Sequence, residues 1–236
     1  ETELFLFAAG RAQHVRQKIL PMLSQGYIVV SSRYIDATTA YQGYGRGIEL
    51  ATVHALNTVA TMGLAPDIVF LLDVSRSMLA EDLAPSRMER AKLAIHDCIE
   101  QLRGDRVALV AFAGTAAIKC PLTQDYGFFR MMLGTIGTDS ISRGGTMMGD
   151  ALRLVVNDVF DDQAKEYKDI ILITDGEDHD SFPVEAAKKA GEKGIRLIAI
   201  GLGDENEGKR IPVMNERGEK TFLKYRGKEV WSRLDA

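Results

Sequence analysis

The stretch Pro66-Asp67-Ile68-Val69-Phe70-Leu71-Leu72-Asp73-Val74-Ser75-Arg76-Ser77-Met78 decides the fold of this chain. Its first half is a continuous apolar run, which is typical of a strand buried on both faces of a parallel sheet. Its second half places Asp73, Ser75 and Ser77 at every second position, where that strand should end. Because alternate side chains of an extended chain point to one side, we expect these three to converge above the carboxyl end of the sheet, where open α/β folds bind ligands.

These side chains favour a metal ion. One carboxylate and two hydroxyls suit a hard cation such as Mg²⁺, which takes about six oxygen ligands. A simpler alternative is that Ser77 only caps a helix and Asp73 only ends a strand. Two later segments favour the metal, because Thr146 follows a glycine pair ahead of a helix-like run, and Asp175 follows a second buried strand at residues 169–174.

These side chains, in this order and at these separations, resemble the metal-ion-dependent adhesion site of von Willebrand factor A domains: Asp73, Ser75, Ser77, Thr146 and Asp175. The resemblance runs from about residue 66 to the end of the chain. Three stretches further resemble the bacterial aerotolerance (Bat) group of these domains, at residues 75–83, 119–126 and 203–223. That group is membrane-anchored and lacks an established enzymatic activity, so the resemblance implies a metal-dependent protein-binding module.

The resemblance also implies a mechanism of binding. Asp73 and Asp175 would supply charge to Mg²⁺ (or Mn²⁺ or Ca²⁺), while the three hydroxyls would bind it directly. Since hydroxyls are neutral, the cation stays under-neutralised and can recruit an oxygen from an Asp or Glu of a protein partner. No bond is made or broken, so no catalytic residue is expected. The acidic loop at residues 177–180 is expected to be a solvated rim, because its spacing matches no firm ligand motif.

Residues 1–65 differ from the rest of the chain. Three segments resemble the middle of a thymidylate kinase, at residues 7–14, 32–34 and 41–47, and this resemblance extends to about residue 73. In that family, arginines at the positions of Arg11 and Arg33 hold the nucleoside monophosphate together with the Tyr41-Gln42 pair. Arg46 matches an arginine of the mobile lid. The resemblance therefore implies dTMP as a possible ligand, since an arginine fork suits phosphate geometry.

Two departures count against kinase activity. The family's Asp-Arg-Tyr triplet begins here with Ser32, which removes a carboxylate from the phosphoryl-transfer centre. No complete G-x-x-x-x-G-K-[ST] phosphate loop occurs in the chain, and positioning of the phosphates is most of this chemistry. The alternative function is therefore a kinase-derived nucleotide-binding protein that is catalytically incomplete. Enzyme activity stays uncertain, and a non-enzymatic role is favoured.

The remaining pattern sets the fold class. Expected strands at residues 106–112, 169–174 and 195–201 alternate with expected helices at residues 86–102, 126–136, 147–160 and 184–192. This alternation predicts an α/β protein with a doubly wound, mostly parallel sheet over residues 66–236, preceded by an α/β fragment at residues 1–65. The fragment should hold helices at residues 1–23 and 49–62, with Pro21 kinking or stopping the first, and a strand at residues 27–30. The tail should hold a hairpin around residues 215–218 and begin a helix near Trp231.

Composition excludes other classes of function. The chain has 236 residues and a net charge of −4, so it lacks the basic excess that nucleic-acid binding requires. Two cysteines make neither a disulfide framework nor a zinc site. We expect the chain as given to be soluble. The Bat resemblance implies a membrane-anchored bacterial parent, with any membrane contact made by segments outside this sequence.

Overall fold

A computed structural model describes residues 1–25, 27, 29, 34–62, 64, 67–102, 105–160, 168–215 and 218–235. The chain forms two compact units, Glu1–Ala65 and Pro66–Ala236. Each unit buries its own set of apolar side chains. Among the described residues, no helix is both long and apolar enough to span a membrane.

The described part of the first unit is helical. Its elements are α1 (Thr2–His14), a π-helical turn (Val15–Ile19), α2 (Leu20–Ser24), α3 (Ile35–Thr38), a second π-helical turn (Thr39–Tyr44) and α4 (Leu50–Thr61). The helical backbone continues from the π-helical turn through Pro21 to the end of α2. Of the two expectations for Pro21, the stop is wrong, and the kink stays a prediction. The strand expected at residues 27–30 lies partly outside the described residues, and neither Tyr27 nor Val29 belongs to a strand.

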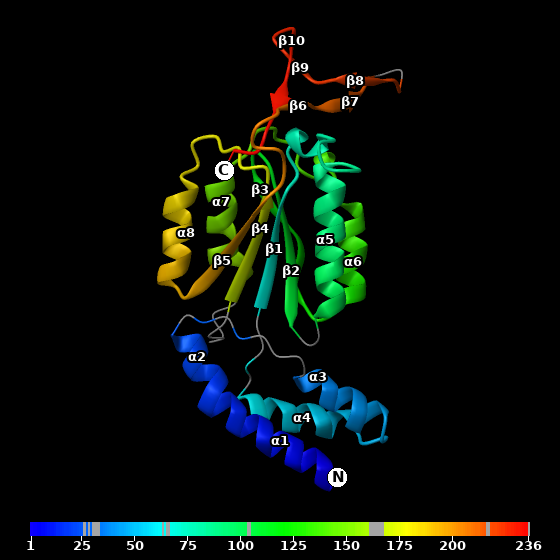
Figure 1. The fold of residues 1–236 in the computed structure, drawn as a ribbon, viewed down its shortest axis with the longest axis vertical. Helices are drawn as coiled ribbons and strands as arrows, with labels where there is room; N and C mark the ends of the chain where they lie inside the picture. Colours follow the sequence, from blue (N-terminus) through cyan, green and yellow to red (C-terminus); the bar gives the residue numbers. More distant parts are fainter. Residues whose placement is uncertain are drawn as a thin grey trace. The chain divides into compact units, whose positions relative to one another are not determined.

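The second unit is built on a five-stranded sheet (Figure 1). Its strands are β1 (Asp67–Asp73), β2 (Arg106–Phe112), β3 (Ala116–Thr123), β4 (Lys168–Thr174) and β5 (Ile195–Gly201), in the spatial order β3-β2-β1-β4-β5. All neighbours pair in parallel except β2 and β3. This arrangement confirms the expected α/β class with a mostly parallel sheet.

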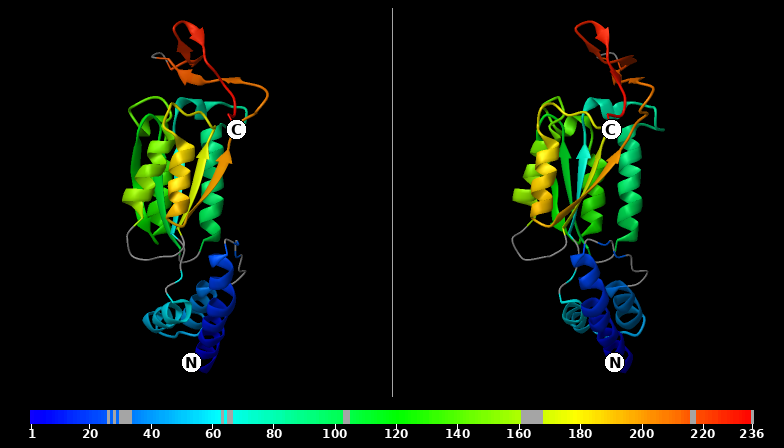
Figure 2. Two further views of the ribbon diagram at one scale, coloured as in Figure 1. Left: turned by 90° about the vertical axis from the view of Figure 1, so that its left-hand side faces the viewer. Right: turned by 60° about the vertical axis from the view of Figure 1, so that its left-hand side comes forward.

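Helices cover both faces of this sheet (Figures 1 and 2). On one face lie α5 (Arg87–Gln101) and α6 (Tyr126–Thr135), and on the other lie α7 (Met148–Leu154) and α8 (Pro183–Glu192). All seven residues of β1 are buried. Its alternate side chains join different cores, since Phe70 packs with the first helix pair and Leu71 with the second. This two-sided burial is the physical reason for the apolar run in the sequence.

Two expectations about the second unit fail. The antiparallel strand β3 is not anticipated, because Pro121 and Lys119 hide its pattern and its pairing with β2 is irregular. The helix expected near Trp231 is instead β11 (Trp231–Ser232), which pairs with β6 (Lys209–Arg210). The other short strands of this tail are β7 (Pro212–Met214), β8 (Lys220–Phe222), β9 (Lys224–Tyr225) and β10 (Lys228–Glu229). The expected hairpin is confirmed as the β7–β8 pair, although Glu216 and Arg217 lie outside the described residues.

Candidate metal site at the carboxyl end of the sheet

The end of β1 holds three of the expected ligands. Asp73 is completely buried, and its two carboxylate oxygens accept different hydrogen bonds. Oδ1 accepts from the backbone N–H of Ser75 at 2.8 Å, and Oδ2 accepts from the Thr174 hydroxyl at 2.7 Å. The hydroxyls of Ser75 and Ser77 lie 2.8 Å apart. The structure therefore gathers these three side chains into one turn, which continues into a 3₁₀ helix (Arg76–Leu79).

Asp175 follows β4, the strand next to β1, and is also completely buried. Its Oδ2 accepts a hydrogen bond from Arg87 at 2.9 Å. Its Oδ1 is buried without a hydrogen-bond partner among the residues that the structure describes. Burial, together with the negative charge of Asp175, raises the pKa of Asp73 to about 7. The two carboxyl groups are thus close enough to repel one another in a poorly solvated place.

Thr146 reaches the same edge of the sheet from the loop before α7, and it is 1% exposed. Its backbone N–H donates to His179 Nδ1 at 3.1 Å, and its carbonyl accepts from the His179 N–H at 2.8 Å. The next residue, Met147, donates its N–H to the carbonyl of Ala113, directly after β2. The threonine is therefore fixed between the loops that follow β2 and β4.

The acidic loop after Asp175, which is expected to be a solvated rim, is partly held by hydrogen bonds to the protein. Asp178 accepts a hydrogen bond from the Met148 N–H at 3.0 Å and another from the Ser181 hydroxyl, so it holds the start of α7. Burial and the charge of Asp175 raise the pKa of Glu177. Asp180 is exposed. Part of this loop therefore supports the position of Thr146, a role that its sequence spacing does not reveal.

Arg87 is a buried charged residue of this site that sequence patterns alone do not reveal. It stands first in α5, directly after the N-cap Ser86, and it is completely buried. Its guanidinium forms a two-pronged pair with Asp82, through Nε–Oδ1 at 2.9 Å and Nη2–Oδ2 at 2.8 Å. Its Nη1 is the group that donates to Asp175. The sequence shows it only as a residue near the start of the helix expected at residues 86–102, because Asp175 is 88 residues away.

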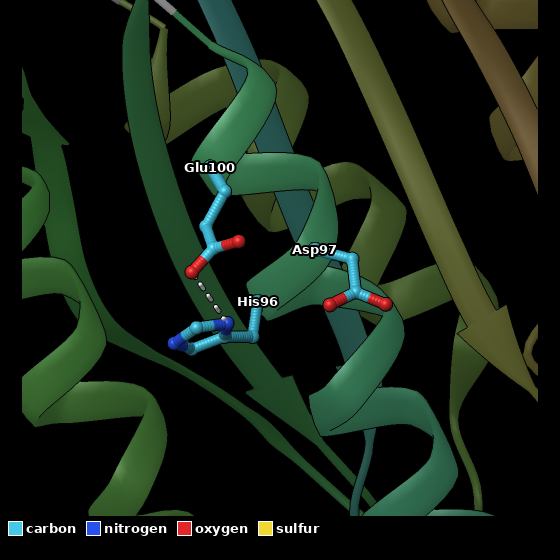
Figure 3. Close-up of side chains that lie close together, drawn as sticks. All are labelled: His96, Asp97 and Glu100. Atoms are coloured by element: carbon cyan, nitrogen blue, oxygen red, sulfur yellow. Dashed lines mark ion pairs between the residues drawn. The ribbon is translucent and has the colours of Figure 1, made fainter.

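A histidine and two acidic residues form a second group away from this edge, on an exposed face of α5. Figure 3 shows His96 and Glu100 facing each other, with Nδ1 and Oε1 3.6 Å apart, while Asp97 comes off the helix beside them. Among the described residues, these three form a group whose possible ligand atoms lie within 4.8 Å of one another. All three are exposed, and such groups are common without a metal. This group is therefore the weaker, rival location for a bound cation.

The first unit contains a cavity of about 690 Å³. Four of the five residues expected to bind a nucleotide line it, namely Arg11, Tyr41, Gln42 and Arg46. The fifth, Arg33, lies outside the described residues. The cavity lining also contains the carboxylate of Glu3. Glu3 forms an ion pair with Arg46 at 2.6 Å and accepts a hydrogen bond from Gln42 at 3.0 Å. Arg11 donates to Asn57, Thr38 and the carbonyl of Tyr34.

Known proteins match the two parts of the chain differently. The family model for the von Willebrand factor type A domain matches residues 68–177. The crystal structure of the conserved hypothetical protein BatB from Bacteroides thetaiotaomicron is 38% identical, with a TM-score of 0.67, over 72% of this chain and 81% of that one. The chain belongs to the von Willebrand factor type A family. An aerotolerance-related membrane protein from Bacteroides fragilis is 35% identical, with the same TM-score, over 72% of this chain and 82% of that protein.

A more distant structure with the same fold holds a metal ion. Proximal thread matrix protein 1 from the mussel byssus, with a zinc-occupied MIDAS motif, is 23% identical with a TM-score of 0.52, over 64% of this chain and 42% of that one. At this identity the likeness shows the shared fold alone.

The thymidylate kinase model matches residues 1–111. The thymidylate kinase of Trichormus variabilis is 43% identical over 105 residues, which are 42% of this chain and 50% of that enzyme. That of Oleidesulfovibrio alaskensis is 55% identical over 74 residues, 31% of this chain and 35% of the enzyme. The chain spans about half the length, or less, of these curated relatives. The two family matches overlap at residues 68–111, which hold a buried strand, a helix and a second strand.

Proposed function

We propose that residues 66–236 form a divalent-cation-dependent module that binds a protein partner, and that Asp73, Ser75, Ser77, Thr146 and Asp175 hold the cation. The observation that carries this proposal is the buried carboxylate of Asp175, whose Oδ1 has no hydrogen-bond partner among the described residues. Leaving a buried charged oxygen without a partner is costly, and a cation would satisfy it.

The local chemistry fits a divalent ion. The proposed ligands offer only oxygen atoms, which are the ligands of Mg²⁺, Mn²⁺ and Ca²⁺. The buried cluster of Asp73, Asp82, Asp175 and Arg87 has three carboxylates and one guanidinium. With all of them ionised, this cluster keeps two negative charges, equal to the charge of one such cation. When bound, the ion would supply a Lewis-acidic position for a carboxylate of the partner.

Residues of this chain hold the proposed ligands in place. Thr174 and the Ser75 N–H each hold one oxygen of Asp73, which fixes the carboxylate in the turn. The Ser75 and Ser77 hydroxyls bond to each other and so are already gathered. We propose that this site recognises a partner without a chemical reaction. The relatives described as Bat and as membrane proteins support a membrane-anchored bacterial parent for this module.

Isothermal titration calorimetry tests the metal proposal. We expect Mg²⁺ or Mn²⁺ to bind the wild-type chain with a micromolar-to-millimolar Kd, and binding to be lost in Asp73→Ala. The matched control is Asp169→Asn, because Asp169 is a carboxylate at the opposite, amino-terminal end of β4, where it pairs with Arg196. This control should bind the ion like the wild type. Equal binding by Asp73→Ala and wild type would contradict the proposal.

A second function rests on the cavity of residues 1–65, whose lining holds Arg11, Tyr41, Gln42 and Arg46. We propose that it binds dTMP through the phosphate and the base, as a domain derived from thymidylate kinase. Residues 203–209 have the glycine and lysine spacing of a phosphate loop, but Arg210 follows and the segment leads into β6 instead of a helix. The proposal is therefore binding and not phosphoryl transfer. A thermal shift with dTMP, reduced in Arg46→Ala, is the expected result; no shift would contradict it.

A further inference from the structure

A segment near the end of the chain lies against the carboxyl end of β4. We name residues 231–235 the C-terminal arm. The Asp235 N–H donates to the carbonyl of Asp175 at 2.9 Å, and the Leu234 N–H donates to the carbonyl of Asp204 at 3.0 Å. Gly176 has φ 91°, and a Cβ there would lie 1.7 Å from the Asp235 carbonyl oxygen. A glycine is thus required for the arm to approach the candidate metal site this closely.

Arg87 joins the arm to the same site through its side chain. Its Nη1 donates to Asp175 Oδ2 at 2.9 Å and to the Ser232 hydroxyl at 2.8 Å, while Nη2 donates to the Ser232 carbonyl at 3.3 Å. Gly203 leaves room for this guanidinium, since a Cβ there would lie 3.0 Å from Arg87 Cζ. Asp82 accepts hydrogen bonds from Nε and Nη2, on the other edge of the guanidinium. One buried side chain therefore bonds to the arm, to a proposed metal ligand and to the loop before α5.

The two oxygens of the Asp175 carboxylate differ in their hydrogen-bond partners. Oδ2 is held by Arg87 and lies 3.4 Å from the Ser232 hydroxyl, whereas Oδ1 is the buried oxygen without a partner among the described residues. A carboxylate held by one oxygen cannot rotate freely, so the other oxygen keeps its direction. Loss of a group that orients a metal ligand in this way typically weakens metal affinity by about 10- to 100-fold.

We propose that Arg87 is a positioning residue that presents Asp175 Oδ1 to the cation, and that the C-terminal arm, held through Ser232, is part of this support. This inference rests on the proposed metal-binding function and assigns to that site a coupling with the arm. By reciprocity, if the docked arm strengthens metal binding, bound metal must strengthen the docking of the arm.

Trp231 gives a direct readout of the arm. It is the only tryptophan of the chain and precedes Ser232, which is the residue that Arg87 holds. Its side chain is 60% exposed, so quenching of its fluorescence by acrylamide can either rise or fall when the arm moves. We expect Mg²⁺ or Mn²⁺ to lower this quenching in the wild-type chain. This readout reports on the arm and does not depend on any partner.

The variants are Ser232→Ala and Arg87→Lys, with Arg196→Lys as the matched control. Arg196 makes the same two-pronged pair with Asp169 at the opposite end of the sheet. We expect Ser232→Ala to weaken metal binding by about tenfold, the size seen when a group that orients a metal ligand is lost. In the absence of metal, acrylamide should also quench Trp231 of this variant more than Trp231 of the wild type. Arg87→Lys should show both effects more strongly, because the single nitrogen of an ammonium cannot replace the five hydrogen bonds that the planar guanidinium makes with its three partners. Arg196→Lys should show neither.

The outcomes separate this inference from the proposed function. If Arg87→Lys fails to fold, Ser232→Ala alone decides. Metal binding by the wild type that leaves Trp231 quenching unchanged or raises it, together with unchanged affinity in Ser232→Ala, overturns the inference and leaves the metal site standing. Absence of metal binding by the folded wild-type chain overturns both.

Discussion

The two units contain opposite arrangements of charge. In the first, Arg11 and Arg46 line a cavity in which Glu3 is the anion paired with Arg46. In the second, Arg87 is the cation that pairs with Asp82 and Asp175, and the charge of Asp175 raises the pKa of Asp73 close by. The Arg46–Glu3 pair is largely exposed, with side chains 59% and 39% accessible, whereas the pairs of Arg87 are buried.

This difference in burial indicates which of the two sites has a side-chain geometry that is set before a ligand binds. An exposed ion pair contributes little and exchanges easily with water or a ligand. A buried charge must keep its partners, since losing one leaves the other unpaired in a poorly solvated place. The cavity of the first unit is therefore expected to rearrange on binding, while the cluster of the second unit holds its shape.

The largest expected effect is the loss of Arg87. Arg87→Met leaves Asp82 and Asp175 buried without their cation, so the free energy of unfolding should fall by about 3–5 kcal/mol. Arg196→Met removes a pair of the same geometry, but Arg196 is 41% exposed, so the expected loss there is about 0–1 kcal/mol. Urea denaturation measures both. Equal losses would show that burial does not distinguish these pairs.

The pH dependence of stability gives a smaller effect. The folded-state pKa of Asp73 is raised from 3.8 to about 7, so the folded state holds a proton that the unfolded state has released between these values. The stability contributed by this group is thus present below pH 4 and is lost as the pH rises to about 7, with a slope of at most about 1.4 kcal/mol per pH unit.

Asp73→Asn should remove this slope from the metal-free protein. The measurement is the difference in unfolding free energy between wild type and variant across pH 4–7. Asp82 does not contribute in this window, because Arg87 outweighs burial and lowers its pKa below 3.8. A difference that is independent of pH would contradict the raised pKa of Asp73.

The smallest effect concerns Glu3 in the first unit. Glu3→Gln removes the carboxylate that competes for Arg46 and Gln42, so the affinity for dTMP should rise by about two- to fivefold. Its effect on stability should stay below about 1 kcal/mol. The control is Glu49→Gln, since Glu49 is an exposed carboxylate of the same unit that bonds to Thr52 outside the cavity lining. Equal dTMP titrations for the two variants would contradict this role of Glu3.

Much of the second unit's fold follows from local sequence. The bounds of β2 and β5 agree with the apolar runs at residues 106–112 and 195–201, and Ser86 accepts the Glu89 N–H as the N-cap of α5, where the helix is expected to begin. These features depend on neighbours within a few residues, which periodicity and capping patterns describe well. The assignment of the five metal ligands remains a prediction, although the structure places Asp73, Ser75 and Ser77 in one turn.

The rest depends on partners that are distant in the chain. Arg87 is a helix-capping neighbour in the sequence, and its burial follows from Asp175 and from Ser232, which is 145 residues away. Trp231 forms a strand because Arg210 pairs with it, and no local pattern shows that pairing. The contact of Thr174 with Asp73 could have been predicted. The two residues end neighbouring parallel strands, β1 and β4, whose register brings them side by side.

The most direct test of the metal site is anomalous diffraction from crystals of the full chain grown with Mn²⁺. The predicted result is a peak at the carboxyl end of β1, within coordination distance of the Ser75 and Ser77 hydroxyls, about 2.0–2.3 Å. A peak only at His96, Asp97 and Glu100, or none at the end of β1 with Mn²⁺ in excess, would contradict the assignment of this site to a divalent cation.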